Sequence, residues 1–179
     1  ALNLKISEFK GINCVNLDAH LDYRLAEGRH SGNGFRYAKQ DGFLQMYFAL
    51  GIHENYIPQH TLNDFDTTEG MLFVTYEDVF VRQQKNWINV LDDAVKFVGI
   101  HHAMGVELDL DSIENIASSA AAPCGLTPRE ALQYIDYMAN HCNVSYLHIC
   151  EGIASGHENA VGKLLSYLVG HFVKARVER

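Results

Sequence analysis

Short apolar runs alternate with segments of helical periodicity along the whole chain. The runs are almost continuous in apolar residues, which is typical of β-strands covered on both faces of a sheet. They occupy residues 12–17, 46–52, 71–76, 103–110 and 144–150. This alternation predicts a layered α/β fold with a mostly parallel sheet.

Three segments between and after these runs have the spacing of amphipathic helices. The clearest one starts with a capping box, in which Thr127 is the N-cap, Pro128 takes the first helical position and Glu130 stands three residues after the cap. In the last segment, apolar residues recur at spacings of three and four, as on the buried face of a helix. They are Val161, Leu164, Leu165, Leu168, Phe172 and Val173. We expect helices over residues 86–98, 127–143 and 158–175.

Composition and charge argue against several classes of protein. The chain is 47% hydrophobic and 20% charged, has no linker-like tract, and is expected to form one domain over residues 1–179. No apolar run approaches the roughly 18 residues of a membrane span, and residues 1–11 do not resemble a signal peptide. The net charge of −8 argues against nucleic acid as a partner, and four scattered cysteines without a CxxC pair favour a cytoplasmic location.

The strongest chemical signal directly follows the first apolar run. In an extended chain Asp18, His20 and Asp22 alternate at period two, so their side chains point to one side. Asp109 and Asp111 repeat this pattern at the end of the fourth run, and ligands of parallel sheets bind at the carboxyl ends of the strands. Crowded carboxylates repel one another unless cations hold them, and oxygen ligands with an imidazole suit Mn²⁺. The alternative is that these acids only meet solvent or cap helices.

Four motifs resemble the ureohydrolase family, which includes arginase, agmatinase and formimidoylglutamase. VNLDAHLDYR resembles its DAHxD motif, MGVELDLDS its SxDxD motif, GLTPREALQYI its GGLTYRE segment, and YLHICEGI the strand with a Glu that faces the substrate. Their order and spacing agree over residues 12–175. The resemblance implies an arginase-like three-layer α/β/α fold, of which this chain is expected to be the C-terminal part.

The resemblance also implies a binuclear manganese site and a small amidine or guanidine as substrate. Two Mn²⁺ ions would activate a water that attacks the amidine carbon. Asp22 would carry a proton to the leaving nitrogen, and Glu151 would pair with the cationic head of the substrate. Family members commonly form homo-oligomers, and no membrane partner is expected. The metal-ligand positions of the family fall on Asp18, His20, Asp22, Asp109 and Asp111.

The loop after the first acidic motif favours formimidoylglutamase over arginase. HSGNGFRYA resembles the formimidoylglutamase loop SGTPFR more than the arginase loop SGNLHG, and Phe35 stands where arginase has its proton-shuttling His. Arg24 occurs in formimidoylglutamases as DAHxDxR, and Arg suits bidentate recognition of a carboxylate. Ser31 and Asn33 are therefore expected to bind substrate with Arg24. The alternatives are an ordinary Gly-rich surface turn and a surface Arg paired with a nearby acid.

Two departures from the family pattern leave the function open. No Gly-Gly-Asp/Ser-His motif precedes Asp18, and Glu107 replaces the small first residue of SxDxD. The leading hypothesis is hydrolysis of N-formimino-L-glutamate to glutamate and formamide. The alternatives are an arginase- or agmatinase-type guanidine hydrolase and a non-catalytic metal-binding relative.

Other histidines are expected to lie outside the chemistry. His101 and His102 precede the fourth run and are expected on the surface. His148 lies within the fifth run and is expected to be a hydrogen-bonded core residue. His53 ends the second run and is expected near the crevice.

Overall fold

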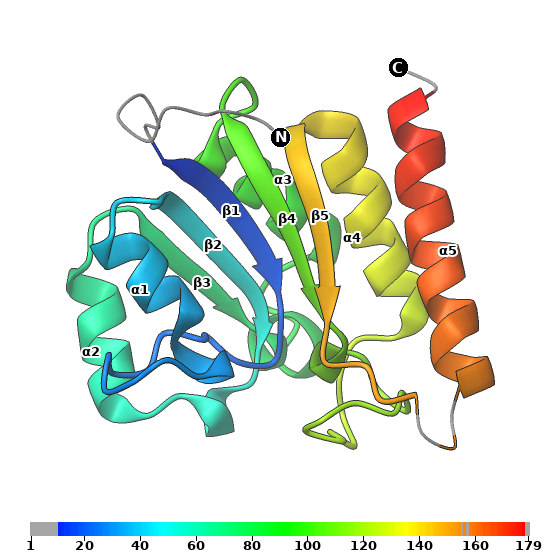
Figure 1. Ribbon diagram of the computed structural model, residues 1–179, viewed down its shortest axis with the longest axis horizontal. Coiled ribbons are helices and arrows are strands. Elements are labelled where there is room, and N and C mark those ends of the chain that lie inside the picture. Colours follow the sequence, from blue (N-terminus) through cyan, green and yellow to red (C-terminus); the bar gives the residue numbers. More distant parts are fainter. Residues whose placement is uncertain (1–10, 155, 157, 178–179) are drawn as a thin grey trace.

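Five parallel strands form one sheet in the order β3-β2-β1-β4-β5 in the computed structural model (Figure 1). The structure describes residues 11–154, 156 and 158–177, so most of the segment compared with signal peptides lies outside it. Each strand covers one of the five predicted runs. The strands are β1 (Ile12–Leu17), β2 (Leu44–Ile52), β3 (Met71–Thr75), β4 (Ala103–Asp109) and β5 (Asn143–Cys150).

Helices cover both faces of the sheet, which confirms the three-layer α/β/α prediction. The three expected helices are α3 (Trp87–Val98), α4 (Pro128–His141) and α5 (Glu158–Val177). The opposite face carries two short helices that the apolar pattern did not predict, α1 (Gly34–Gln40) and α2 (Gln59–Thr67) (Figure 1). Short 3-10 or π turns occupy η2 (Ser31–Asn33), η3 (Glu54–Tyr56), η4 (Glu77–Val81) and η5 (Leu110–Ser112).

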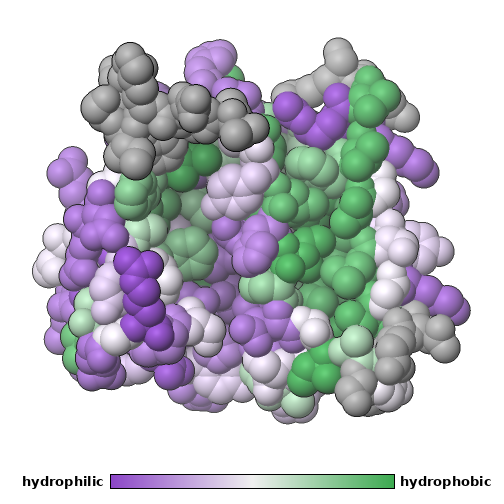
Figure 2. Space-filling model, viewed as in Figure 1, coloured by the Kyte–Doolittle hydropathy of each residue, from purple (hydrophilic) through white to green (hydrophobic). Residues whose placement is uncertain are grey.

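Two apolar cores lie on the two faces of the sheet. The larger contains Val15, Leu17 and side chains of α3, α4 and α5, and the smaller contains Tyr47 and Phe65 with side chains near α1 and α2. Figure 2 shows apolar side chains gathered over β5 and α5. Val173, which the helical spacing predicted to be buried, is 50% exposed because α5 is the outermost helix and packs mainly on α4. No helix in the described part of the chain has the length and apolarity to cross a membrane.

The topology changes direction between β1 and β4. From β1 the chain adds β2 and β3 on one side, and it then places β4 and β5 on the other side. In open α/β sheets such a switch point creates a crevice at the carboxyl ends of the strands. Leu17 pairs with Leu108, so Asp18 and Asp109 leave the sheet side by side.

Candidate metal site

Three carboxylates meet at this switch point. One oxygen from each of Asp18, Asp22 and Asp109 lies within 4.8 Å of the others. Asp18 and Asp109 are 1% and 5% exposed. The expected convergence of the two acidic motifs is therefore present in the fold.

The first acidic motif is held partly by its neighbours in β1 and β2. Asp18 accepts hydrogen bonds from the backbone N–H of His20 at 2.8 Å and from the Asn16 side chain at 3.1 Å. The Asn16 amide also donates to the hydroxyl of Tyr47 at 2.9 Å. Asp22 has φ of 47°, a left-handed conformation that costs free energy for a residue other than glycine and is common at functional sites.

The second acidic motif is held by backbone N–H groups. Asp109 accepts from the N–H of Asp111 at 2.7 Å. Asp111 in turn accepts from the N–H of Ala120 at 2.9 Å and from the hydroxyl of Ser119 at 3.0 Å. The turn η5 and the loop near residue 120 therefore fix both carboxylates.

Crowding perturbs the protonation of these acids. Burial first, and then the charge of Asp18, raises the pKa of Asp22 to about 8 and that of Asp109 to about 7. A divalent cation among the three carboxylates would replace this repulsion with attraction and favour their charged forms. The donors are mainly carboxylate oxygens, with one imidazole nearby, so the residues present fit Mn²⁺.

His20 and Asp111 are the two remaining predicted metal ligands, and they lie beside the three carboxylates. The Nδ1 atom of His20 lies 3.5 Å from Asp18 Oδ1 and 4.0 Å from Asp111 Oδ2. The hydrogen bond to Asp18 raises the pKa of His20. All five predicted ligand residues therefore surround one crevice, and Nδ1 is the ring nitrogen turned toward the acids.

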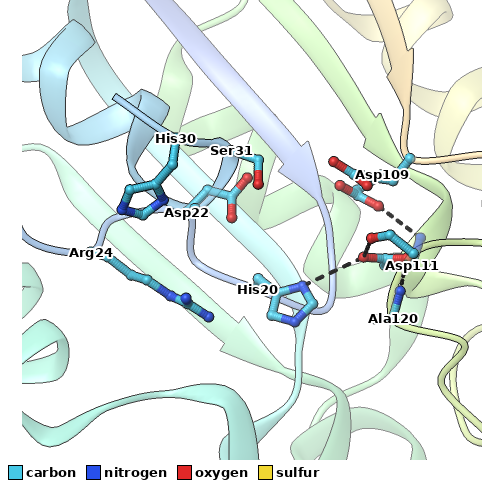
Figure 3. A pocket seen from close by; sticks show the side chains of 11 residues that line it. His20, Asp22, Arg24, His30, Ser31, Asp109, Asp111 and Ala120 are labelled. Carbon is cyan, nitrogen blue, oxygen red and sulfur yellow. Dashed lines mark hydrogen bonds and ion pairs between the residues drawn. The ribbon is translucent and has the colours of Figure 1, made fainter. Parts of the chain in front are cut away.

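A cavity of about 210 Å³ opens next to the acids and has two chemically different sides. Figure 3 shows Asp109 and Asp111 on one side and Arg24 with His30 on the other. Ser31 and Glu151 also line the cavity, so Arg24, Ser31 and Glu151 lie where the motifs placed them. Glu151, like Asp22, has a left-handed backbone, with φ of 62°.

The loop that carries Arg24 packs closely on itself. A Cβ atom at Gly32 would lie 3.2 Å from Cδ of Arg24 and 3.5 Å from Nδ1 of His30. Asn33 does not line the cavity. Its side chain is buried and donates to the backbone oxygens of Leu25 and Gly28 at 3.0 and 2.7 Å. Asn33 therefore shapes the loop from inside.

Arg36 anchors the same loop to α2. Its guanidinium donates to the backbone oxygens of Tyr23 and Arg24 at distances down to 2.6 Å, and to Asp64 at 2.8 Å. It also lies over the Tyr23 ring, 4.5 Å from the centroid. Arg36 is only 9% exposed, and it stabilises the backbone that directly follows the first acidic motif.

A second cavity of about 330 Å³ adjoins the acids along the sheet and is bordered by Phe35, Glu107 and His148. Glu107 Oε2 lies 2.5 Å from Nδ1 of His148, and Oε1 accepts from Tyr146 at 2.7 Å. The prediction of a core position for His148 is wrong, because β5 is an edge strand and the His148 side chain is 58% exposed. Glu107, the large residue that departs from the SxDxD pattern, is therefore paired with His148 and Tyr146.

Sequence reasoning missed several residues of the crevice. His30 directly precedes Ser31, and its place in HSGNG was the available signal. Ser119 and Ala120 follow Asp111 in a stretch without a recognisable pattern, so nothing local identified them. Of the other histidines, His101 and His102 are exposed as predicted.

Comparison with known proteins agrees with this geometry. A family model described as the arginase family matches residues 5–154. The formimidoylglutamase of Macrococcus caseolyticus is 27% identical over 174 residues, which cover 95% of this chain and 52% of that protein. The chain thus spans about half the length of the curated relatives it matches.

Solved structures show the same fold. A manganese-containing formiminoglutamase of Trypanosoma cruzi superposes with a TM-score of 0.81 at 21% identity, over 93% of this chain and 56% of that one. The formimidoylglutamase of Bacillus subtilis gives 0.78 at 21% identity, over 95% and 55%. Proclavaminate amidino hydrolase of Streptomyces clavuligerus gives 0.75 at 20% identity, over 93% and 56%. With the family model matching most of its length, the chain belongs to the arginase family.

Proposed function

We propose that this chain carries the binuclear manganese site of a hydrolase that cleaves a C–N bond in a formimino or guanidino compound. The leading substrate is N-formimino-L-glutamate, and the products are L-glutamate and formamide. The relatives named formimidoylglutamase support this choice. The observation that carries it is the two-sided cavity, in which acids face Arg24, His30 and Ser31.

The cavity suits a substrate that is cationic at one end and anionic at the other. A formimino group binds next to Glu151, whose carboxylate pairs with its positive charge. Arg24 meets a carboxylate of the glutamate part through its planar guanidinium. Ser31 adds a hydroxyl donor beside it, while Asn33 and Arg36 keep the loop in place.

Water supplies the oxygen of formamide and the proton of the amine product. Divalent cations at the cluster, when bound, supply Lewis acidity and lower the pKa of water. Asp22 takes the proton from this water and delivers it to the glutamate nitrogen as the C–N bond breaks. Asp22 suits this task because it belongs to the acidic cluster and also lines the cavity. Asp18, His20, Asp109 and Asp111 would hold the cations together with Asp22.

Product analysis of the manganese-loaded chain tests the proposal. We expect formamide from N-formimino-L-glutamate and no urea from arginine or agmatine. Arg24→Gln is expected to raise KM for formiminoglutamate by about 30-fold, the value of a charge-assisted hydrogen bond of roughly 2 kcal/mol. The control Arg129→Gln removes an exposed guanidinium on α4 and should leave KM unchanged.

Other outcomes identify the alternatives. Urea release would assign a guanidine hydrolase. Mn²⁺ binding without turnover of any amidine or guanidine would assign a non-catalytic metal-binding relative. The departure from the family pattern at Glu107, which contacts His148 beside the acids, favours this alternative. The homo-oligomer and the cytoplasmic location stay predictions.

A further inference from the structure

A column of aromatic rings leads from the acidic crevice into the core. The ring centroids of successive members are 4.8 to 5.6 Å apart. The members at the crevice are nearly parallel, with interplanar angles of 15°, 30° and 4°. In order, the rings belong to His20, Tyr56, His53, Tyr76, Phe80 and Trp87.

The first rings of the column are also tied together through the backbone. The N–H of His53 donates to the carbonyl of Ala19, next to His20, at 3.0 Å. The N–H of Tyr56 donates to the carbonyl of His53 at 3.0 Å, within the turn that leads into η3. Tyr56 then lies on His20, with centroids 4.8 Å apart. The backbone bonds therefore hold the segment that carries Tyr56 next to the segment that carries His20.

His53 supports Tyr56 from behind. It is 9% exposed and lies flat on Tyr76, with centroids 4.9 Å apart and an angle of 4°. Burial lowers the pKa of His53, which keeps its ring neutral near a site for cations. Among the described residues its Nε2 atom forms no hydrogen bond, so stacking is the contact that its side chain supplies.

His20 needs such support because its polar contacts are long. Its Nδ1 atom is 3.5 Å from Asp18 and 4.0 Å from Asp111, and at these distances the two contacts restrain rotation of the ring about the Cβ–Cγ bond only weakly. A ring packed on its face restricts that rotation. Groups that orient a metal ligand from outside typically change metal affinity by about 10- to 100-fold.

We propose that Tyr56, backed by His53, is a positioning residue that fixes the imidazole plane of His20 for the metal. Its effect on metal binding rests on the proposed function, whereas its effect on the ring does not. Tyr56 is 37% exposed, so its replacement leaves the core intact.

Manganese affinity of matched variants tests this role. EPR of free Mn²⁺, titrated into the full chain, is expected to show binding about ten-fold weaker in Tyr56→Leu. Tyr56→Phe keeps the ring and should stay within about two-fold of the parent. The control is Tyr137→Leu on α4, because Tyr137 stacks on His141 at 4.1 Å and 18° without touching the crevice. Parent-like affinity in Tyr56→Leu would overturn the proposal, as would an equal loss in Tyr56→Phe.

NMR of the metal-free chain separates this inference from the proposed function. The ring current of Tyr56 should shift the His20 ring protons upfield in the parent and in Tyr56→Phe, and the shift should vanish in Tyr56→Leu. Unchanged His20 signals in Tyr56→Leu would overturn the inference. If the parent binds no Mn²⁺, the proposed function fails, while the His20 signals still decide whether Tyr56 holds the ring.

Discussion

The two acidic motifs, residues 18–22 and residues 109–111, carry similar side chains but are held in different ways. Asp109 and Asp111 accept hydrogen bonds from nearby N–H groups, including that of Ala120. By contrast, Asp22 sits in a left-handed backbone conformation, and its carboxylate accepts no hydrogen bond from any residue that the structure describes.

The difference shows where each motif gets its geometry. The second motif is organised mainly by its own turn η5 and the loop that follows. The first motif depends on residues distant in sequence, because Arg36 and Asp64 hold its loop and Tyr56 covers His20. We therefore expect the first motif to be the more sensitive to remote substitutions.

Removing the charge of either Asp22 or Asp109 should give the largest effect, a loss of Mn²⁺ affinity. Asp22→Asn and Asp109→Asn should each weaken Mn²⁺ binding by at least about 100-fold, because outer-shell changes alone reach that size. In the metal-free chain Asp22→Asn should raise Tm more than Asp109→Asn, since only Asp109 loses a hydrogen-bonded charge. EPR and thermal unfolding measure both quantities, with exposed Asp93→Asn as control. Equal changes in Tm in Asp22→Asn and Asp109→Asn would contradict the view that the two acidic motifs are held differently.

Removal of the Arg36 anchor tests the dependence of the first motif on distant residues. Arg36→Met should lower the free energy of unfolding by about 3 kcal/mol, because buried carbonyls of Tyr23 and Arg24 lose their donor. Urea unfolding followed by circular dichroism measures this. The control Arg82→Met breaks exposed ion pairs with Glu54 and Asp78 and should lower the free energy of unfolding far less than Arg36→Met does. Similar losses in both variants would show that the loop needs no buried anchor.

Proton linkage gives a third test. The pKa values of Asp22 and Asp109 are raised in the folded chain, to about 8 and about 7 from an ordinary 3.8, so folding favours their protonated forms. Their stabilising contribution is complete below about pH 4 and is lost as pH rises to about 8. We expect a loss on the order of 2 kcal/mol, since one protonation relieves much of the shared repulsion.

Urea unfolding of the metal-free chain from pH 5 to pH 9 measures this loss. The double variant with Asp22→Asn and Asp109→Asn should lack it, and saturating Mn²⁺ should reverse its direction in the parent. An identical pH dependence in parent and double variant would refute the assignment to these two carboxyls.

The smallest effect is expected from a change next to the second motif, residues 109–111. Ser119→Ala removes one of two hydrogen bonds to Asp111 and leaves the N–H of Ala120 in place. Stability should fall by about 1 kcal/mol, and Mn²⁺ affinity by about ten-fold at most. The control Ser166→Ala removes a hydroxyl that bonds only within α5. A loss of affinity as large as that in Asp109→Asn would mean that the N–H of Ala120 does not hold the Asp111 carboxylate by itself.

The sequence by itself determined the strands, the helices α3 to α5 and the identity of the acids. Buried parallel strands require continuous apolar runs, and Thr127 with Glu130 forms the capping box that marks the start of α4. Asp18 directly follows one apolar run and Asp109 lies near the end of another, so a parallel sheet puts both acids at its carboxyl edge. The short helices α1 and α2 escaped prediction because each buries only one or two side chains.

Tertiary structure decided everything that depends on segments far apart in the chain. The switch point between β1 and β4 puts Asp18 beside Asp109, and the edge position of β5 exposes His148 to Glu107. The stack of Tyr56 on His20 joins residues with no common local pattern. Periodicity and motifs record only what neighbours in sequence require, whereas these contacts arise from strand order and from the loops that meet at the sheet's carboxyl edge.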